Sequence, residues 1–260
     1  MNSINFFGLK VSSFSSDELD NYIVECFNQK KSFIFYGYSL AVLSYIKKHK
    51  QYYNITSKFD LLVTDGRLFF LIIKLFKFRL LYDISIPRLT IRVLEIANKL
   101  GLNVYLLGAT ELSETKAIIN LREKYSNLSS ICGHNGFFSK NDEKKVLNDI
   151  IVTKPNVILI GMPTPYKQEL ALKLKDKLQN CIIIPCGGMI DVFAGKEKLT
   201  PTFIKKIGLA SIYRHIQHPK RIPELFIIGV RTIYVFSICA YLKFIKKDSN
   251  ISIPKILGVI

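Results

Sequence analysis

Acidic residues are scarce in this sequence, which has 20 Asp and Glu against 37 Lys and Arg and a formal net charge of +17. Such an excess of positive charge predicts an anionic partner, which could be nucleic acid, anionic lipid or a phosphorylated substrate. Residues 196–248 alone contain 11 basic and 3 acidic residues among many Ile, Phe and Tyr. This mixture favours an anionic membrane surface. Nucleic acid is not expected as a partner, because we find no groove-reading or base-stacking motif.

Cysteine is scarce as well. The five cysteines are scattered and mostly lie inside apolar runs, and only the weak Cys181-x4-Cys186 pair approaches the spacing of a metal site. We therefore expect reduced, buried thiols in a cytosolic protein. Residues 1–10 lack the basic n-region and long apolar core of a signal peptide, so none is expected. A chain of 260 residues can bury a good core and needs no more than one domain with an appendage.

The stretch Pro155–Lys196 organises the chain, because two short apolar runs within it each end in a glycine turn. These runs, residues 156–160 and 181–185, are expected to be buried strands. The segment between them carries apolar residues at helical spacing and predicts a helix from Tyr166, with Thr164 as its N-cap. This order of elements is typical of a parallel sheet, in which ligands bind at the carboxyl ends of the strands.

The residue types in these turns suit a nucleotide-sugar ligand. Gly161, Gly187 and Gly188 let backbone amides approach a phosphate closely. Lys167 and Gln168 begin the helix, where N–H groups and the helix dipole favour an anion. Glycine turns of this kind are also common without a ligand, so the residues alone leave open the alternative that they only form tight turns.

The rest of the chain repeats the same alternation. Apolar runs over residues 31–36, 59–64, 103–107 and 128–132 are expected to be strands, each followed by a helix, and a further helix is expected over residues 91–100. The fold class is therefore α/β with a parallel sheet. Asp65 follows the second of these runs, and a carboxylate at the end of a strand in a cleft is a natural general base. By spacing alone, an Asp-Gly pair is more often an ordinary turn.

Four segments resemble, in order and spacing, motifs of the WecG/TagA/CpsF glycosyltransferases, which form glycosyltransferase family 26. They read LLVTDGRLFF, NVYLLGATELSETKAIINLREKYSNLSSICGHNGFF, IGMPTPYKQE and PCGGMIDVFAGK. The resemblance extends from about Ile4 to about Arg221. It implies a Rossmann-like nucleotide-binding core. The implied reaction transfers a hexosyl unit, of the N-acetylmannosamine type or another hexose, from a UDP-sugar to a polyprenyl-diphosphate-linked sugar in cell-surface polysaccharide biosynthesis, with inversion.

The resemblance also implies roles for single residues. Asp65 would be the catalytic base that deprotonates the acceptor hydroxyl. Lys167, Gln168 and backbone amides of the glycine turns would hold the donor diphosphate, with Gly108 and Gly136 on the same face of the sheet. The Asp-x-Asp motif of metal-dependent transferases is absent, so no metal or other cofactor is expected. Positive side chains and helix N-termini would stabilise the leaving diphosphate instead.

Three further residues have two interpretations each. By resemblance Arg88 contacts a pyrophosphate, although Ile91 and Val93 replace the Gly and Asp of the family motif; the alternative is an exposed basic residue. Phe137 stacks on a uracil ring, or it is a core side chain. Asp191 accepts a hydrogen bond from a ribose hydroxyl or the uracil N–H, or it caps a turn.

Residues 199–260 are expected to form a basic, apolar appendage to a catalytic core of residues 1–198. In the family this appendage lies against the membrane and closes over the active site. By resemblance Arg214 and Arg221 contact a diphosphate, and the alternative is that they are surface residues near anionic lipid. Residues 225–245 are long enough to span a bilayer, but an arginine within them favours in-plane binding. We therefore expect a peripheral protein at the cytoplasmic face of the plasma membrane.

Two alternatives belong to other classes of function. A membrane-surface nucleotide-sugar-binding protein that has lost catalysis would explain why several motif positions depart from the family. Those positions are Gly37, Ile91, Val93, Ala109, Leu199 and Glu224. A nicotinamide-dependent oxidoreductase would need a Gly-x-Gly-x-x-Gly motif after an early strand, and this motif is absent. The apolar stretch Arg67–Leu81 indicates either membrane contact or self-association into a homo-oligomer.

Overall fold

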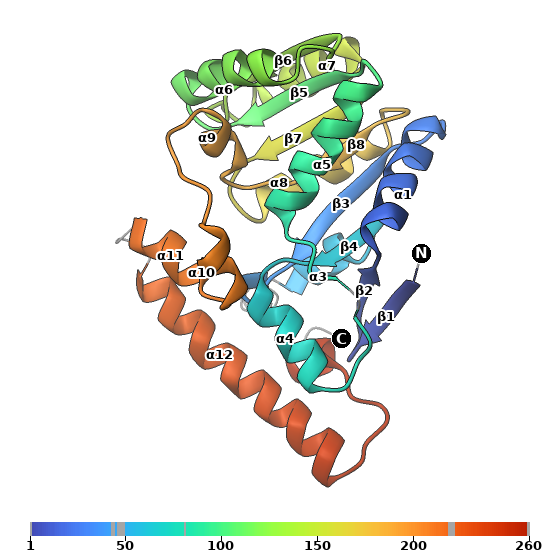
Figure 1. Ribbon diagram of the computed structural model, residues 1–260, viewed down its shortest axis with the longest axis vertical. Coiled ribbons are helices and arrows are strands. Elements are labelled where there is room, and N and C mark those ends of the chain that lie inside the picture. Colours follow the sequence, from blue (N-terminus) through green and yellow to red (C-terminus); the bar gives the residue numbers. More distant parts are fainter. Residues whose placement is uncertain (1, 43–44, 46–49, 81, 218–221, 259–260) are drawn as a thin grey trace.

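The centre of the molecule is a six-stranded sheet in the order β4-β3-β8-β7-β5-β6, in which every neighbouring pair is parallel (Figure 1). The computed structural model describes residues 2–42, 45, 50–80, 82–217 and 222–258. The strands are β3 (Phe33–Tyr38), β4 (Leu61–Thr64), β5 (Asn103–Gly108), β6 (Ser130–His134), β7 (Val157–Gly161) and β8 (Ile182–Ile184). The α/β fold class with a parallel, Rossmann-like sheet is confirmed.

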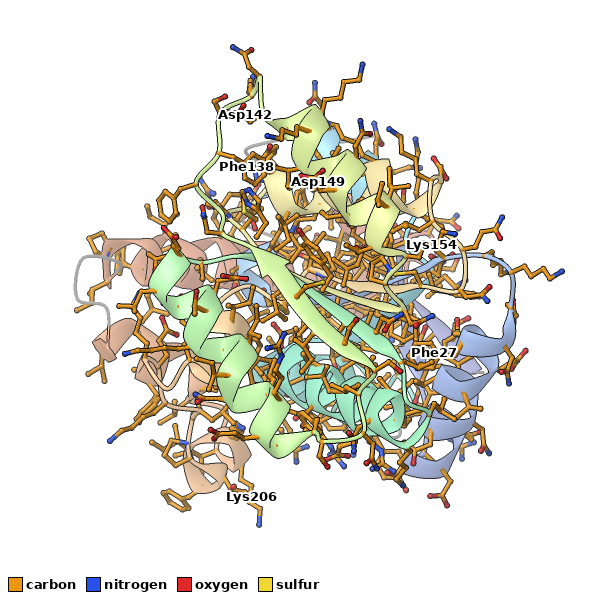
Figure 2. All side chains as sticks on the ribbon, turned by 90° about the horizontal axis from the view of Figure 1, so that it is seen from above. Phe27, Phe138, Asp142, Asp149, Lys154 and Lys206 are labelled. Carbon is orange, nitrogen blue, oxygen red and sulfur yellow. The ribbon has the colours of Figure 1, made fainter. Side chains whose placement is uncertain are left out.

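Helices connect the strands and cover both faces of the sheet. They are α1 (Ser16–Asn28), α3 (Lys50–Thr56), α4 (Arg67–Leu75), α5 (Ile86–Lys99), α6 (Glu111–Lys124), α7 (Glu143–Thr153), α8 (Tyr166–Lys175) and α9 (Met189–Phe193). Figure 2, seen from above, labels Asp142 and Lys154, which flank α7 at its two ends. Because parallel strands all end at one edge, the turns that follow them gather there.

Alternating side chains of the strands build one hydrophobic core on each face of the sheet. In β3, Ile34 and Tyr36 belong to the core that contains α8, whereas Phe33 and Phe35 belong to the core that contains α1 and α5. Figure 1 shows α1 and α5 lying across the same face of the sheet. The central strands are buried on both sides, which explains their continuous apolar sequences.

Three local boundaries differ from the sequence-based expectation. The strand β3 continues through Gly37 to Tyr38, because Gly37 pairs with Val63 of β4 in the parallel ladder. The helix α5 begins at Ile86 instead of residue 91, with a proline in its first turn, a position where a missing N–H costs nothing. The N-cap of α8 is Pro165 and not Thr164, and no side chain caps this helix.

The remaining elements lie outside the sheet. A two-stranded antiparallel hairpin, β1 (Asn2–Phe6) and β2 (Leu9–Ser13), precedes α1. The C-terminal part contains α10 (Thr202–Lys206), α11 (Ala210–Gln217), α12 (Ile222–Ala240), a π-helical turn over Tyr241–Ile245 and α13 (Ile253–Ile256). By length and composition alone, the helix over Leu225–Ile245, with a mean hydropathy of 1.9, could cross a membrane.

The long helix α12 is attached to the core along one stripe. Phe236 packs against Phe6 of the hairpin and against Phe69 and Phe76 at α4. At the end of this helix the ammonium of Lys243 donates to the carbonyl of Phe76 at 2.6 Å. Figure 1 shows α12 running along the outside of the molecule. The helix α12 therefore shares one hydrophobic core with the hairpin.

The last described residues return to the hairpin. The amide of Ile253 donates to the carbonyl of Phe7 at 2.7 Å, and Ile251, Ile253 and Leu257 are buried in the same core as Phe6. No role for this tail follows from the sequence pattern. In the structure it holds the end of α12 against the hairpin.

Candidate active site

Asp65 lies at the carboxyl edge of the sheet, directly after β4. Its amide donates to the carbonyl of Tyr38 at 2.7 Å, and its Oδ1 accepts from the amide of Ile86 at 3.1 Å. The carboxylate is therefore held between the ends of β3 and β4 and the first turn of α5. The first contact fixes the main chain of Asp65 and the second its carboxylate, and a general base requires such a fixed orientation.

A cavity of about 110 Å³ opens beside Asp65. Its wall brings together the carboxyl ends of two different strands, since Asp65 follows β4 whereas Cys186 and Gly188 follow β8. The segment after α9 covers it with Glu197 and Thr200. The structure thus places two of the sequence-predicted site residues, Asp65 and Gly188, on one cavity.

A cation, Arg67, lines the same cavity as Asp65. Arg67 is the first residue of α4, and its Nη1 lies 4.0 Å from Oδ2 of Asp83. Burial raises the pKa of the Asp83 carboxyl, and the neighbouring Arg67 charge opposes this effect. Arg67 Nε and Asp83 Oδ1 are buried without a hydrogen-bond partner among the described residues. The sequence analysis did not predict Arg67 as a site residue. Its position directly after the Asp-Gly pair was the signal that could have indicated it.

The predicted glycines form a row of close backbone contacts across the strand ends. A Cβ atom on Gly108 would lie 2.5 Å from the carbonyl oxygen of Gly161, and one on Gly161 would lie 3.0 Å from that of Gly187. A Cβ on Gly136 would lie 3.1 Å from Cα of Gly108. The turns can approach only without side chains at these positions. The tight-turn role is therefore shown for these glycines, and phosphate binding stays a prediction.

Two backbone amides in these turns already donate hydrogen bonds to neighbouring carbonyls. The amide of Ala109 donates to Gly161 at 3.3 Å, and that of Gly136 donates to Ala109 at 2.9 Å. Ala109 itself has a φ of 61°. The turn therefore keeps the left-handed conformation that suits glycine, although an alanine occupies the position.

Lys167 and Gln168 are neighbours in sequence and lie in different surroundings. Lys167 Nζ lies 3.6 Å from the point that a Cβ atom on Gly187 would occupy, so its ammonium stands beside the glycine turn. Gln168 is 0% exposed, and its Nε2 donates to the hydroxyls of Tyr36 and Tyr52, both at 3.1 Å. Here Gln168 joins β3 and α3 to α8 beneath the turn; its role as a diphosphate contact stays a prediction.

Asp191 and Phe137 each lose one of their two interpretations. Asp191 lies inside α9 and pairs with Lys196 at 3.1 Å, so it is not the cap of a turn. Its carbonyl accepts from the amides of Lys196 and Glu197, which folds this segment back over α9. Phe137 is 78% exposed in the loop after β6, so the core-residue alternative is wrong. Contacts of either residue with a nucleotide stay predictions.

The predicted arginines are not gathered around Asp65. Arg88 is exposed in the first turn of α5 and lines a neighbouring groove instead of the Asp65 cavity. The backbone of Arg214 lies in α11, but its side chain is outside what the structure describes. Arg221 falls outside the described residues altogether. Sequence reasoning missed two other groups on the cavity wall, Glu197 and Lys205.

No metal-binding cluster is found in the described part of the chain, where no three His, Cys, Asp or Glu side chains gather as ligands would. The four cysteines for which burial is complete or nearly so have raised thiol pKa values, and that of Cys186 is raised to about 12. Cys186 lines the cavity, but this value keeps it protonated at neutral pH and unsuited to be a nucleophile. The carboxylates on the cavity wall are Asp65 and Glu197, and Asp65 is the one that directly follows a strand of the sheet.

The fold and the cavity together define an α/β protein in which an aspartate and a glycine-rich turn meet at the carboxyl edge of a parallel sheet. The chain belongs to the WecG/TagA/CpsF family of glycosyl transferases, whose family model matches residues 4–247. This membership confirms the resemblance seen in the sequence motifs.

Curated relatives are similar over most of their length. UDP-Gal:alpha-D-GlcNAc-diphosphoundecaprenol beta-1,4-galactosyltransferase of Shigella boydii is 28% identical over 193 residues, which cover 68% of this chain and 79% of that protein. N-acetylglucosaminyldiphosphoundecaprenol N-acetyl-beta-D-mannosaminyltransferase of Staphylococcus aureus strain MW2 is 29% identical over 206 residues, 79% of each chain. Both names describe transferases that act on a sugar linked to diphosphoundecaprenol, but they transfer different sugars.

Proposed function

We propose that this protein is an inverting hexosyltransferase that moves a hexose from a UDP-sugar to a polyprenyl-diphosphate-linked N-acetylglucosamine. The observation that carries the proposal is that Asp65 and Gly188 line one cavity at the carboxyl edge of the sheet. A base and a phosphate-cradling turn then lie within the reach of a single nucleotide sugar. Relatives that use the same kind of acceptor support this assignment.

The proposed reaction is a direct displacement. An acceptor hydroxyl attacks the anomeric carbon of the donor, the new C–O bond forms as the bond to the diphosphate breaks, and UDP leaves. Asp65 takes the hydroxyl proton, since its Oδ1 is held by the Ile86 amide and the residue lines the cavity. Base catalysis of this kind contributes about 10²- to 10⁴-fold to the rate.

The leaving diphosphate needs positive partners. Lys167 stands beside Gly187 and supplies one positive charge next to the glycine turn. Arg67 supplies another on the Asp65 side of the cavity. Fixed charges of this kind stabilise a developing anion without reorganisation. We therefore keep the proposal that the reaction needs no metal ion, which unchanged turnover in a chelator would support.

The membrane is the proposed location of the acceptor. The outward stripe of α12 is apolar, with Phe226, Val230 and Ile233 all exposed on one side of the helix. The opposite stripe, which includes Val235 and Phe236, is buried against the core. A helix held in this way suits in-plane binding, and we propose a peripheral protein at the cytoplasmic face.

A binding protein without catalysis is the second candidate. One of the six departures that motivated it is Gly37, near a position where the family often has a polar residue. The structure gives Gly37 a different explanation, because it makes room for Asp65 and Ile86. The retained, oriented Asp65 favours the enzyme.

The decisive experiment measures UDP release with detergent-solubilised polyprenyl-diphosphate-GlcNAc and a panel of donors that includes UDP-galactose and UDP-N-acetylmannosamine. We expect Asp65→Asn to lower turnover about 10²- to 10⁴-fold while UDP affinity stays the same, because the change removes the base and keeps its size. Asp60→Asn is the matched control. Asp60 lies at the other end of the same strand, where it pairs with Lys175 at 2.8 Å.

Each outcome has a separate meaning. Equal turnover in wild type and Asp65→Asn would remove Asp65 as the base and leave the transferase proposal standing. UDP binding without turnover on any donor would favour the binding protein. Acceptor-independent UDP release would show hydrolysis of the donor and contradict the transfer reaction.

A further inference from the structure

A second, larger hollow adjoins the Asp65 cavity. This groove, of about 530 Å³, lies between the N-terminal end of α1, the first turns of α5 and the helix α10. Its volume falls within the range of small-molecule sites. Ser85, Pro87 and Lys205 line both the groove and the Asp65 cavity, so the two hollows share a wall.

The charge of the groove is suited to an anion. Arg88 of α5 and Lys205 of α10 line it from two different elements. Its wall also includes Glu95, but Arg92 pairs with Glu95 at 2.8 Å and with Asp20 of α1. The acidic side chain is thus compensated, and the same arginine fixes α1 to α5 on either side of the groove. A rigid basic groove remains.

The rim of the groove is apolar. Tyr82 lines the groove and is 48% exposed, and Phe203 is an exposed aromatic residue of α10. An anionic group bound at Arg88 would have the Asp65 cavity across the shared wall, and exposed aromatic side chains at Tyr82 and on α10 nearby. These surroundings suit a sugar, a diphosphate and a polyprenyl chain joined in that sequence.

We infer that this groove binds the diphosphate of the lipid-linked acceptor, with Arg88 and Lys205 as its contacts. The inference rests on the proposed function, because it takes the reacting hydroxyl to lie at Asp65. The acceptor sugar would then cross the shared wall at Ser85 and Pro87. The donor is left with the other side of the cavity, at Gly188 and the glycine turns.

The absence of tryptophan from the sequence gives a direct test. Tyr82→Trp introduces a single indole at the rim of the groove. The probe is a GlcNAc diphosphate carrying a short alkyl chain, and UDP is the comparison ligand. We expect saturable fluorescence changes with the GlcNAc diphosphate and none with UDP. An alkyl GlcNAc without the diphosphate should cause no change at the same concentrations.

Charge-removing variants in the Tyr82→Trp background identify the contacts. Arg88→Gln should weaken binding of the GlcNAc diphosphate about tenfold, the effect of one lost charge-assisted contact, while UDP affinity measured by calorimetry stays the same. Lys99→Gln, in the last turn of the same helix, is the matched control. Lys205→Gln and Lys206→Gln form a second pair, since Lys205 lines the groove and Lys206 extends away from the molecule (Figure 2).

Three results would overturn the inference. A signal with UDP and none with the GlcNAc diphosphate would assign the groove to the donor. Equal affinity for the GlcNAc diphosphate in Arg88→Gln and Lys99→Gln would show that Arg88 does not contact the diphosphate. No fluorescence change with either ligand would show that the groove binds neither. Because fluorescence needs no turnover, binding without UDP release would leave the groove standing while the transfer reaction fails.

Discussion

Gly37 of β3 and Asp65 after β4 touch across the sheet so closely that no side chain fits between them. A Cβ atom at position 37 would lie 2.6 Å from Cβ of Asp65 and 2.7 Å from Cγ1 of Ile86. Either the carboxylate or the first turn of α5 would have to move. The glycine is thus part of how the proposed base is positioned.

We predict that Gly37→Ala destabilises the protein and misplaces Asp65. Overpacking of this kind costs about 1–3 kcal/mol in the free energy of unfolding. A shift of the base by about 1 Å lowers turnover about 10²-fold. Thermal unfolding and UDP release measure the two effects. In Gly229→Ala, a helical position with open space around it, stability should rise slightly or stay the same. If Gly37→Ala has the stability and turnover of this control, the close approach of Gly37 to Asp65 is not needed to position the base.

The buried amide of Gln168 gives a second prediction. It donates to Tyr36 and Tyr52, whose hydroxyls also bond to each other. Gln168→Leu removes the donor and is expected to lower the free energy of unfolding by about 1–3 kcal/mol. In a double-mutant cycle with Tyr52→Phe, the two changes should not be additive, because they act on one network. Urea unfolding measures both. Unchanged stability with lost UDP affinity would instead make the amide a ligand contact.

Ala109 provides a prediction of the opposite sign. Its φ of 61° costs an alanine about 1–2 kcal/mol, a cost that glycine does not have. Allowing for the greater freedom of glycine in the unfolded chain, Ala109→Gly should stabilise the protein by about 0.5–1 kcal/mol. Ala117→Gly, the same change inside α6, should destabilise it by about 1 kcal/mol. Unfolding curves that rank these variants in the reverse order would contradict the strain at Ala109.

Much of this fold could be predicted because its signals are local. Strands buried on both faces need continuous apolar runs, and most turns at the carboxyl edge contain glycine or Asp-Gly. The turn after β3 is an exception, because Gly37 lies inside the strand. The motifs around Asp65 and Gly188 therefore led to residues that share one cavity. The pairing of Arg67 with Asp83 and the groove at Arg88 were not predictable, because they depend on where α4, α5 and α10 meet in space.

The C-terminal part shows the same limit. Its apolar character was visible in the sequence, but which stripe of α12 is buried depends on the aromatic residues of the hairpin and α4. Composition alone could not separate a helix that spans from one that lies flat. The structure separates two stripes, and this division leads to a prediction about the membrane.

We predict that Ile233→Glu abolishes binding to vesicles of phosphatidylglycerol and phosphatidylcholine. Ile233 is 69% exposed on the outward stripe of α12, so a carboxylate there leaves the fold intact but cannot enter lipid. The lost apolar contact alone corresponds to about a tenfold or greater drop in partitioning. Val152→Glu, a change at an exposed apolar residue of α7, is the matched control and should bind as wild type does.

The same vesicles distinguish a helix that lies flat from one that spans. With Val235, Phe236 and Cys239 kept in the core, α12 can enter lipid only along its outer stripe. Alkaline carbonate should then release the wild-type protein from sedimented membranes, because no segment crosses the bilayer. Protein that stays in the pellet after this treatment would mean that α12 leaves the core and inserts, and that the appendage rearranges at the membrane.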